Sequence, residues 1–136
     1  MLIKSPCNGF SFIEILIALA IVIILAQAAI PHFSSIFMHT KRLQAAQNLS
    51  KIALVLENFY LEHQKYTGAT LSNLHLEYLR DNPDYEYKIE SATENDYLLI
   101  AKPINDQEEN DHCGALTLNA YGEKNITGTA KIDVCW

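Results

Sequence analysis

Glu14 is the residue of this sequence best placed to do chemistry, because it is the only charged residue in an apolar run of 21 residues from Phe10 to Ile30. A carboxylate at the centre of a bilayer costs at least about 2.5 kcal/mol, so it needs a counter-charge. The nearest basic residues, Lys4 and Lys41, lie outside the run. Cleavage after Gly9 would create an α-ammonium about one helical turn from Glu14. We therefore expect Glu14 to pair with that new amino terminus, on the same copy or on a neighbour.

The apolar run is long enough to cross a membrane. As a helix, its 21 residues extend roughly 30 Å, which is the hydrocarbon thickness of a bilayer. A secretory signal peptide is the alternative, and Ala26-Gln-Ala28 resembles its cleavage site. Such a signal, however, has a shorter apolar region, whereas here the polar residues come first. We expect a transmembrane and assembly helix over residues 10–31.

The segment Gly9-Phe-Ser-Phe-Ile-Glu14, followed by an apolar helix, resembles the class III signal of type IV prepilins. The resemblance implies that a prepilin peptidase cleaves between Gly9 and Phe10, that residues 1–9 are a cytoplasmic leader, and that the new amino group of Phe10 is N-methylated. It also implies that Glu14 recruits an incoming subunit during assembly. Pro31 falls where helices of this family commonly kink, since proline removes a backbone donor.

Beyond Pro31 the apolar residues recur at helical spacing, which predicts that the helix continues to about Glu62. Residues 63–84 should form a connecting loop in which several leucines pack on the sheet. These residues are Leu71, Leu74, Leu76 and Leu79.

Strand patterns follow the loop, and they predict strands over residues 85–89, 97–101, 115–119 and 130–134. The expected fold class is α+β. A long N-terminal helix has a transmembrane first half, and its second half packs on a small antiparallel sheet of three to four strands. Residues 32–136, which include that second half, should form the periplasmic or extracellular globular pilin domain.

The cysteines extend the resemblance to the other end of the chain. Removing the leader with Cys7 leaves Cys113 and Cys135, which we expect to form a disulfide in an oxidising compartment. The pieces Asp111-His-Cys-Gly114 and Cys135-Trp136 are similar to the C-terminal half of PilE-type minor pilins. The disulfide favours a pilus subunit over a pseudopilin of type II secretion, since major pseudopilins generally lack it.

Metal binding and catalysis find little support. The acidic stretch 106–111 is expected to be a solvated loop, because a calcium site needs a turn that gathers six or more oxygens. Zinc at His112, Cys113 and Cys135 would need a fourth ligand and reduced thiols. The sequence has no GxSxG, HExxH or glycine-rich phosphate motif. We expect no enzyme activity, no metal and no cofactor.

The charge argues against DNA as a partner. The formal net charge is −6, and nearly all charged residues lie after residue 31. Non-specific nucleic-acid binding needs clustered cations that displace counterions. The sheet and disulfide region offers only scattered lysines, which are Lys88, Lys102, Lys124 and Lys131. DNA binding is therefore expected to be unlikely.

Together these features predict a structural subunit, a minor pilin, of a type IV pilus. The expected partners are other pilin subunits, the prepilin peptidase, the inner-membrane assembly machinery and, before assembly, membrane lipid. The chain should cross the inner membrane once and then move to a pilus at the cell surface, where it would contribute to pilus biogenesis, adhesion, twitching motility or DNA uptake. The alternatives are a type II secretion pseudopilin and a membrane-tethered binding module that never polymerises.

Overall fold

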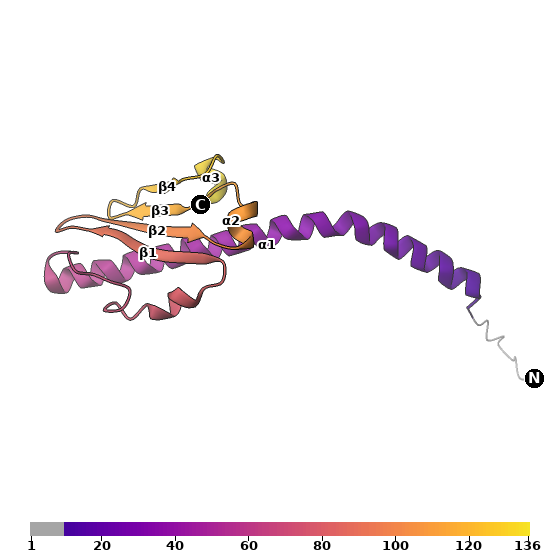
Figure 1. Ribbon diagram of the computed structural model, residues 1–136, viewed down its shortest axis with the longest axis horizontal. Coiled ribbons are helices and arrows are strands. Elements are labelled where there is room, and N and C mark those ends of the chain that lie inside the picture. Colours follow the sequence, from indigo (N-terminus) through magenta and orange to yellow (C-terminus); the bar gives the residue numbers. More distant parts are fainter. Residues whose placement is uncertain (1–9) are drawn as a thin grey trace, which may run out of the picture. The chain divides into compact units, whose positions relative to one another are not determined.

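The computed structural model describes residues 10–136, except for the side chains of residues 28–32. By its contacts the chain divides into two units, one ending at Ile36 and the other covering Phe37–Trp136. Figure 1 shows one long helix and a small sheet. The elements are α1 (Phe12–His63), η1 (Glu77–Asp81), β1 (Tyr85–Ala92), β2 (Tyr97–Pro103), α2 (Asp106–Asn110), β3 (Leu116–Asn119), β4 (Lys124–Ile126) and α3 (Ile132–Cys135).

The sheet has four strands in the order β1-β2-β3-β4, and every neighbouring pair is antiparallel. It packs on the second half of α1 (Figure 1). A long helix, an antiparallel sheet and a C-terminal disulfide were all expected, so the predicted α+β fold is confirmed.

The core lies between α1 and the sheet because both elements have an apolar face. On α1 the buried positions are three or four residues apart, and Ala45, Leu49, Ile52 and Leu56 are completely inaccessible. On the strands the buried positions alternate, as the pleat requires. These strand residues are Tyr85, Tyr87, Tyr97, Leu99, Ala101, Leu116 and Leu118.

The connection between α1 and β1 also contributes to the core. Its four leucines are buried, as the sequence predicts, and Leu79 belongs to the short helix η1. Thr70 and Asn73 hold the loop in shape by exchanging two hydrogen bonds, of 2.7 and 3.2 Å. The loop therefore packs as a defined part of the domain.

The predicted strand over residues 130–134 is wrong, because residues 132–135 form the helix α3. The fourth strand is β4, which comes earlier in the chain. Gly122, with a φ of 76°, lets the chain turn back directly after β3, and the Asn119 side chain accepts from the N–H groups of Tyr121 and Glu123. The tight turn brings residues 124–126 alongside β3.

The solvated loop predicted for residues 106–111 is also wrong. Residues 106–110 form the helix α2, and Gln107 is completely buried. Asp111, which follows this helix, is buried as well. Polar residues can be placed there because each is hydrogen-bonded, as described below.

The Cys113–Cys135 disulfide is present, and both cysteines are buried. It closes a loop of sequence separation 22 and ties α3 to the segment that precedes β3. A cross-link of this span contributes about 3 kcal/mol by the chain-entropy estimate. The disulfide therefore fixes the C-terminus of the chain against the sheet.

Candidate assembly site

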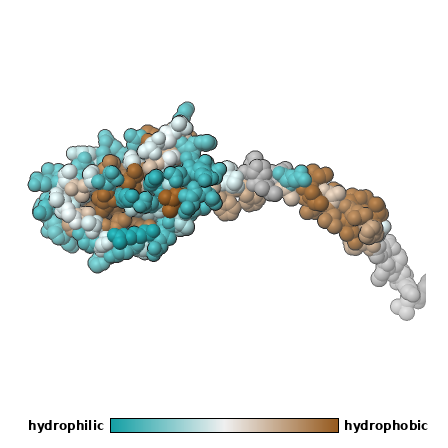
Figure 2. Space-filling model, viewed as in Figure 1, coloured by the Kyte–Doolittle hydropathy of each residue, from teal (hydrophilic) through white to brown (hydrophobic). Residues whose placement is uncertain are grey.

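The N-terminal part of α1 presents large apolar side chains to its surroundings on every side. Figure 2 shows them as a brown segment of the helix. Phe10 is 83% exposed and Phe12 is 78% exposed. Apolar surface of this extent marks a place that contacts lipid or other protein. The other exposed large apolar residues of this segment are Ile13, Ile15, Leu16, Ile17, Leu19, Ile21, Val22, Ile23, Ile24 and Leu25.

Glu14 lies in the first turn of α1, beside a shallow groove of about 370 Å³. The groove is lined by Phe10, Glu14, Ile15, Ala18 and Leu19, so the structure brings Phe10 and Glu14 to one place. The helix starts at this point, since the carbonyl of Ser11 accepts from the N–H of Ile15. A carboxylate at a helix N-terminus is also favoured by the helix dipole. Within the described residues, no basic side chain forms a salt bridge with Glu14.

Two of the predicted site residues cannot be assessed in the same way. Gly9, on the leader side of the expected cleavage, lies outside the described residues. Pro31 lies within α1, but its side chain is among those that the structure does not describe. Cleavage at Gly9, methylation at Phe10 and a kink at Pro31 stay predictions.

Among the residues that the structure describes, no helix combines the length and the apolar character that a membrane crossing requires.

A buried polar cluster joins α1 to the disulfide region, and nothing in the sequence pattern identified it. Arg42 on α1 donates through Nε to Asp111 Oδ2 at 3.0 Å and through Nη1 to the carbonyl of Val134 at 3.3 Å. The Tyr85 hydroxyl donates to the same Asp111 oxygen at 3.0 Å. The N–H of Cys113 donates to Asp111 Oδ1 at 2.9 Å. One carboxylate thus connects α1, β1 and the disulfide.

The electrostatics of this cluster follow from its contacts. Burial by itself would raise the pKa of Asp111, but the hydrogen bond and charge of Arg42 and the N–H of Cys113 outweigh it, so the pKa lies below its ordinary value of 3.8. Burial and the neighbouring Asp111 charge raise the pKa of the Tyr85 hydroxyl. At neutral pH the cluster therefore contains an ionised Asp111 and a neutral Tyr85.

Gln107 completes the cluster. Its Nε2 donates to Asp111 Oδ2 at 2.6 Å and lies 3.1 Å from both the carbonyl of Met38 and the Tyr85 hydroxyl. Its Oε1 is buried and has no partner among the described residues. Residues 106–111 are all acidic or amide residues, a pattern that predicts a solvated loop, so no sequence signal pointed to this buried network.

The described residues contain no group of three or more His, Cys, Asp or Glu side chains arranged to hold a metal ion. His112 directly precedes Cys113 in the chain, and Cys113 is bonded to Cys135. Neither cysteine therefore has the free thiol that a zinc site with His112 would need. The assembly helix and the cluster around Asp111 remain the candidate sites.

A long helix whose N-terminal part is apolar apart from one acid, with its second half under a four-stranded antiparallel sheet and a C-terminal disulfide, is the architecture of a type IV pilin. A family model described as "Type IV minor pilin ComP, DNA uptake sequence receptor" matches residues 31–117, and a model of the prokaryotic N-terminal methylation motif matches residues 4–29. Because the first match covers more than half of the chain, this chain belongs to that minor-pilin family.

Solved structures agree with the family. A type IV pilin from Shewanella oneidensis has a TM-score of 0.55 and 26% sequence identity, with 73% of this chain and 97% of that chain covered. The non-core minor pilin PilV of Neisseria meningitidis has a TM-score of 0.54 over 70% of this chain and 92% of its own, and at 20% identity it shows the fold alone. A comparison with curated proteins gives no match.

Proposed function

We propose that this chain is a minor subunit of a type IV pilus, anchored in the inner membrane before assembly and then inserted into the filament through its N-terminal helix. The observation that carries the proposal is the exposed apolar segment of α1 with Glu14 and Phe10 at one groove. The family and the methylation motif support it, since they imply a membrane-anchored chain that is associated with a pilus.

Assembly would work through packing and one ion pair. Lipid tails are as apolar as the helix surface, so moving the helix from lipid to a filament gains little hydrophobic free energy. Close packing and the pairing of Glu14 with the Phe10 ammonium of a neighbour must then select the correct position. An unpaired charge among apolar helices costs several kcal/mol, so only the position that pairs Glu14 is stable. The prepilin peptidase and the membrane assembly machinery are the partners that this route needs. The proposed role is structural and involves no catalysis.

DNA binding during uptake is the second candidate, because the matched family is described as a DNA uptake sequence receptor. One local feature favours it. Lys124 lies 4.9 Å above the ring of Trp136, at the edge of a groove of about 550 Å³ on the sheet. A cation and an aromatic ring side by side are typical of single-strand binding surfaces. The net charge of −6 opposes it, so we rank it second.

The experiment is N-terminal sequencing and mass determination of the chain from two fractions, sheared surface filaments and the inner membrane. We expect an N-methylated Phe10 as the first residue in the filament fraction, at low abundance relative to the major subunit. The same processed chain confined to the membrane would instead support a pseudopilin, and an intact Met1 would contradict the proposal. Retention of DNA by the recovered filaments, weakening steeply as salt increases, would support the second candidate.

A further inference from the structure

Arg42 on α1 contacts the chain next to both cysteines of the disulfide. Its Nε donates at 3.0 Å to Oδ2 of Asp111, which lies two residues before Cys113. Its Nη1 donates at 3.3 Å to the carbonyl of Val134, the residue directly before Cys135. The two contacts reach 69 and 92 residues along the chain. One guanidinium group therefore holds the flanks of both cysteines.

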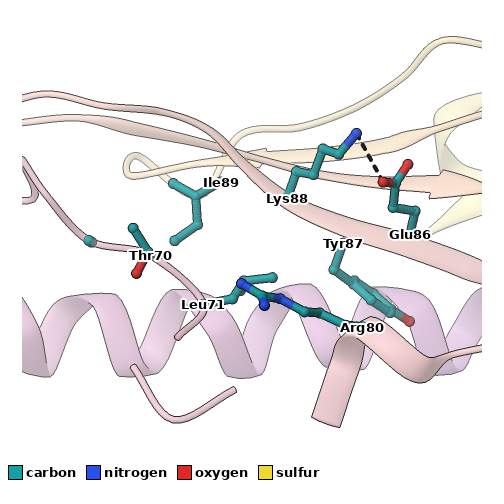
Figure 3. Close-up of a pocket in the computed structure, with 8 residues that line it drawn as sticks. Thr70, Leu71, Arg80, Glu86, Tyr87, Lys88 and Ile89 are labelled. Carbon is teal, nitrogen blue, oxygen red and sulfur yellow. Dashed lines mark ion pairs between the residues drawn. The ribbon is translucent and has the colours of Figure 1, made fainter. Parts of the chain in front are cut away.

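Two cations at the groove beside β1 make contacts of much shorter range. In Figure 3, Lys88 forms an ion pair of 3.0 Å with Glu86 on the same strand, and both side chains are about half exposed. Arg80 lines the same groove of about 470 Å³ and donates to Ser72 at 2.8 Å, within the connection between α1 and β1. Neither contact links α1 to the C-terminus, as that of Arg42 does.

The Arg42–Asp111 pair is shielded from water, since 12% of the Arg42 side chain is exposed and none of the Asp111 side chain. The N–H of Cys113 donates to the other carboxylate oxygen, so Asp111 links Arg42 to the main chain of Cys113. Gln107 bonds to the same carboxylate and to the carbonyl of Met38. Breaking a buried pair is strongly destabilising. The positions of residues 38–42 and of Cys113 are therefore coupled.

The contact to Val134 matters because the C-terminal segment is short. α3 has four residues, and a helix of this length is not stable by itself. Besides the disulfide, the Trp136 indole N–H attaches this segment to β4 by donating to the Asn125 carbonyl at 3.1 Å. In the reduced chain, the place of Cys135 thus depends on side-chain contacts such as that of Arg42.

We propose that Arg42 is a positioning residue for the disulfide. Packing of α1 on the sheet brings Cys113 and Cys135 together through Arg42, and the disulfide in turn locks residues 38–42 of α1 to the domain. The coupling is reciprocal, because a contact that favours disulfide formation by some factor must itself be favoured by the disulfide by the same factor. The inference concerns the globular unit and does not depend on the proposed pilus role.

The coupled step is thiol–disulfide exchange with a small disulfide oxidant such as oxidised glutathione. The thiolate of one cysteine attacks the oxidant, forms a mixed disulfide and releases one glutathione. The second cysteine thiolate then attacks the protein sulfur of the mixed disulfide, so that the Cys113–Cys135 bond forms and the second glutathione leaves. Two electrons pass from the protein to the oxidant, and the two thiol protons end on the released glutathione thiols. The second attack requires the cysteines to meet, so the equilibrium reports their effective concentration.

The test measures this effective concentration in glutathione redox buffers. It uses the full-length chain in detergent with Cys7→Ser, so that Cys113 and Cys135 are the only thiols. Arg42→Lys keeps a positive charge beside Asp111 but loses the planar fork that reaches two acceptors at once. We expect the effective concentration to fall about five-fold, the effect of losing one ordinary hydrogen bond. An unchanged value would overturn the proposal.

Two matched controls separate positioning from a general loss of stability. Lys41→Met removes the ion pair of the adjacent residue on α1, whose Nζ lies 2.6 Å from Asp84 Oδ1. Ile52→Val leaves a small gap at a completely buried position of the same helix. Neither control should change the effective concentration. If Ile52→Val lowers it as far as Arg42→Lys does, the effect comes from global stability and the proposal is wrong.

Hydrogen exchange tests the reciprocal effect. The N–H groups of residues 42–46 bond to the carbonyls of residues 38–42 in a regular helix. Reduction of the disulfide should speed their exchange several-fold in the parent chain and much less in Arg42→Lys, while residues 49–56 stay protected. If reduction loosens residues 132–136 alone, or unfolds the whole domain, the disulfide does not act on α1 through Arg42, and the proposal fails.

Discussion

At the scale of single residues, Asp111 determines how the parts of the globular domain are joined. It is the one carboxylate that Arg42, Tyr85 and Gln107 all contact, and it lies two residues before Cys113. Removing one partner of a buried ion pair leaves the other charge uncompensated. The network is therefore expected to tolerate substitutions poorly.

Asp111→Asn should lower the free energy of unfolding by about 3 kcal/mol at neutral pH, because Arg42 loses its buried partner. The pKa of Asp111 is depressed in the folded chain, so its stabilising contribution is complete above the ordinary value of 3.8 and is lost as the pH falls through the lower, folded value. The difference between parent and variant should thus shrink in acid. Urea unfolding at pH 7 and at pH 3 measures this.

The matched control for this prediction is Asp133→Asn, since Asp133 is an exposed acid on α3. It should change the unfolding midpoint little at either pH. A loss of stability in Asp111→Asn that is the same at both pH values would show that the ionised form is not what stabilises the fold.

Residue types predicted the burial of this region only in part. Tyr85, Tyr87 and Tyr97 occupy inward positions of the predicted strands 85–89 and 97–101, and all three are buried. What the strand pattern could not supply was the partner of each hydroxyl, because those partners lie on α1 or after β2. Asn48 donates to the Tyr87 hydroxyl at 2.9 Å, and Glu57 accepts from Tyr66 and Tyr97 at 3.0 and 3.4 Å. These pairs depend on the packing of distant segments, not on local spacing.

At the scale of elements, the sequence predicted the long helix and the first three strands because their periodicity is strong over many residues. The fourth strand and α3 were missed for a physical reason. β4 has only three residues, and its position depends on the Gly122 turn and on the disulfide. An alternating pattern over residues 130–134 is equally compatible with one helical turn, so local pattern alone could not decide.

Gly128 holds the segment before α3 against the segment around the disulfide. The N–H of Gly128 donates to the carbonyl of Cys113 at 3.0 Å, and a Cβ at this position would overlap the carbonyl of His112. Gly128→Ala should therefore destabilise the fold by about 2 to 3 kcal/mol, because main chain must move. Thermal unfolding in detergent under oxidising conditions measures the effect.

Gly122→Ala is the contrasting control. Gly122 has a φ of 76° but nothing within 4 Å of its would-be Cβ, so alanine there meets strain without a clash. It should cost about 1 kcal/mol. If Gly122→Ala destabilises the chain more than Gly128→Ala, close approach of the two segments is not what requires glycine at position 128.

At the scale of the whole molecule, the globular unit and the N-terminal segment of α1 treat their apolar side chains differently. The globular unit from Phe37 onward has a buried apolar core and keeps the polar network around Asp111 internal. The N-terminal segment of α1 leaves its apolar residues exposed, and only contact with lipid or with other helices can cover them. In the pilus subunit that we propose, stability therefore depends on the buried core of the globular unit, and assembly depends on the exposed apolar segment of α1.

Glu14 separates these two roles most directly, because it belongs to the exposed apolar segment and lies outside the unit that begins at Phe37. Glu14→Ala should still be cleaved after Gly9 and should fold normally. The amount of the variant in sheared filaments should drop strongly, and the amount in the membrane should rise, because the Phe10 ammonium of a neighbour loses its counter-charge. Glu14→Asp keeps the charge and should retain part of the incorporation, whereas Glu14→Gln keeps the shape and should behave like alanine. Quantitative immunoblots of the two fractions decide between these outcomes. If Glu14→Gln enters filaments as well as the parent chain does, shape and not charge selects the position of the subunit, and the ion pair would have no part in assembly.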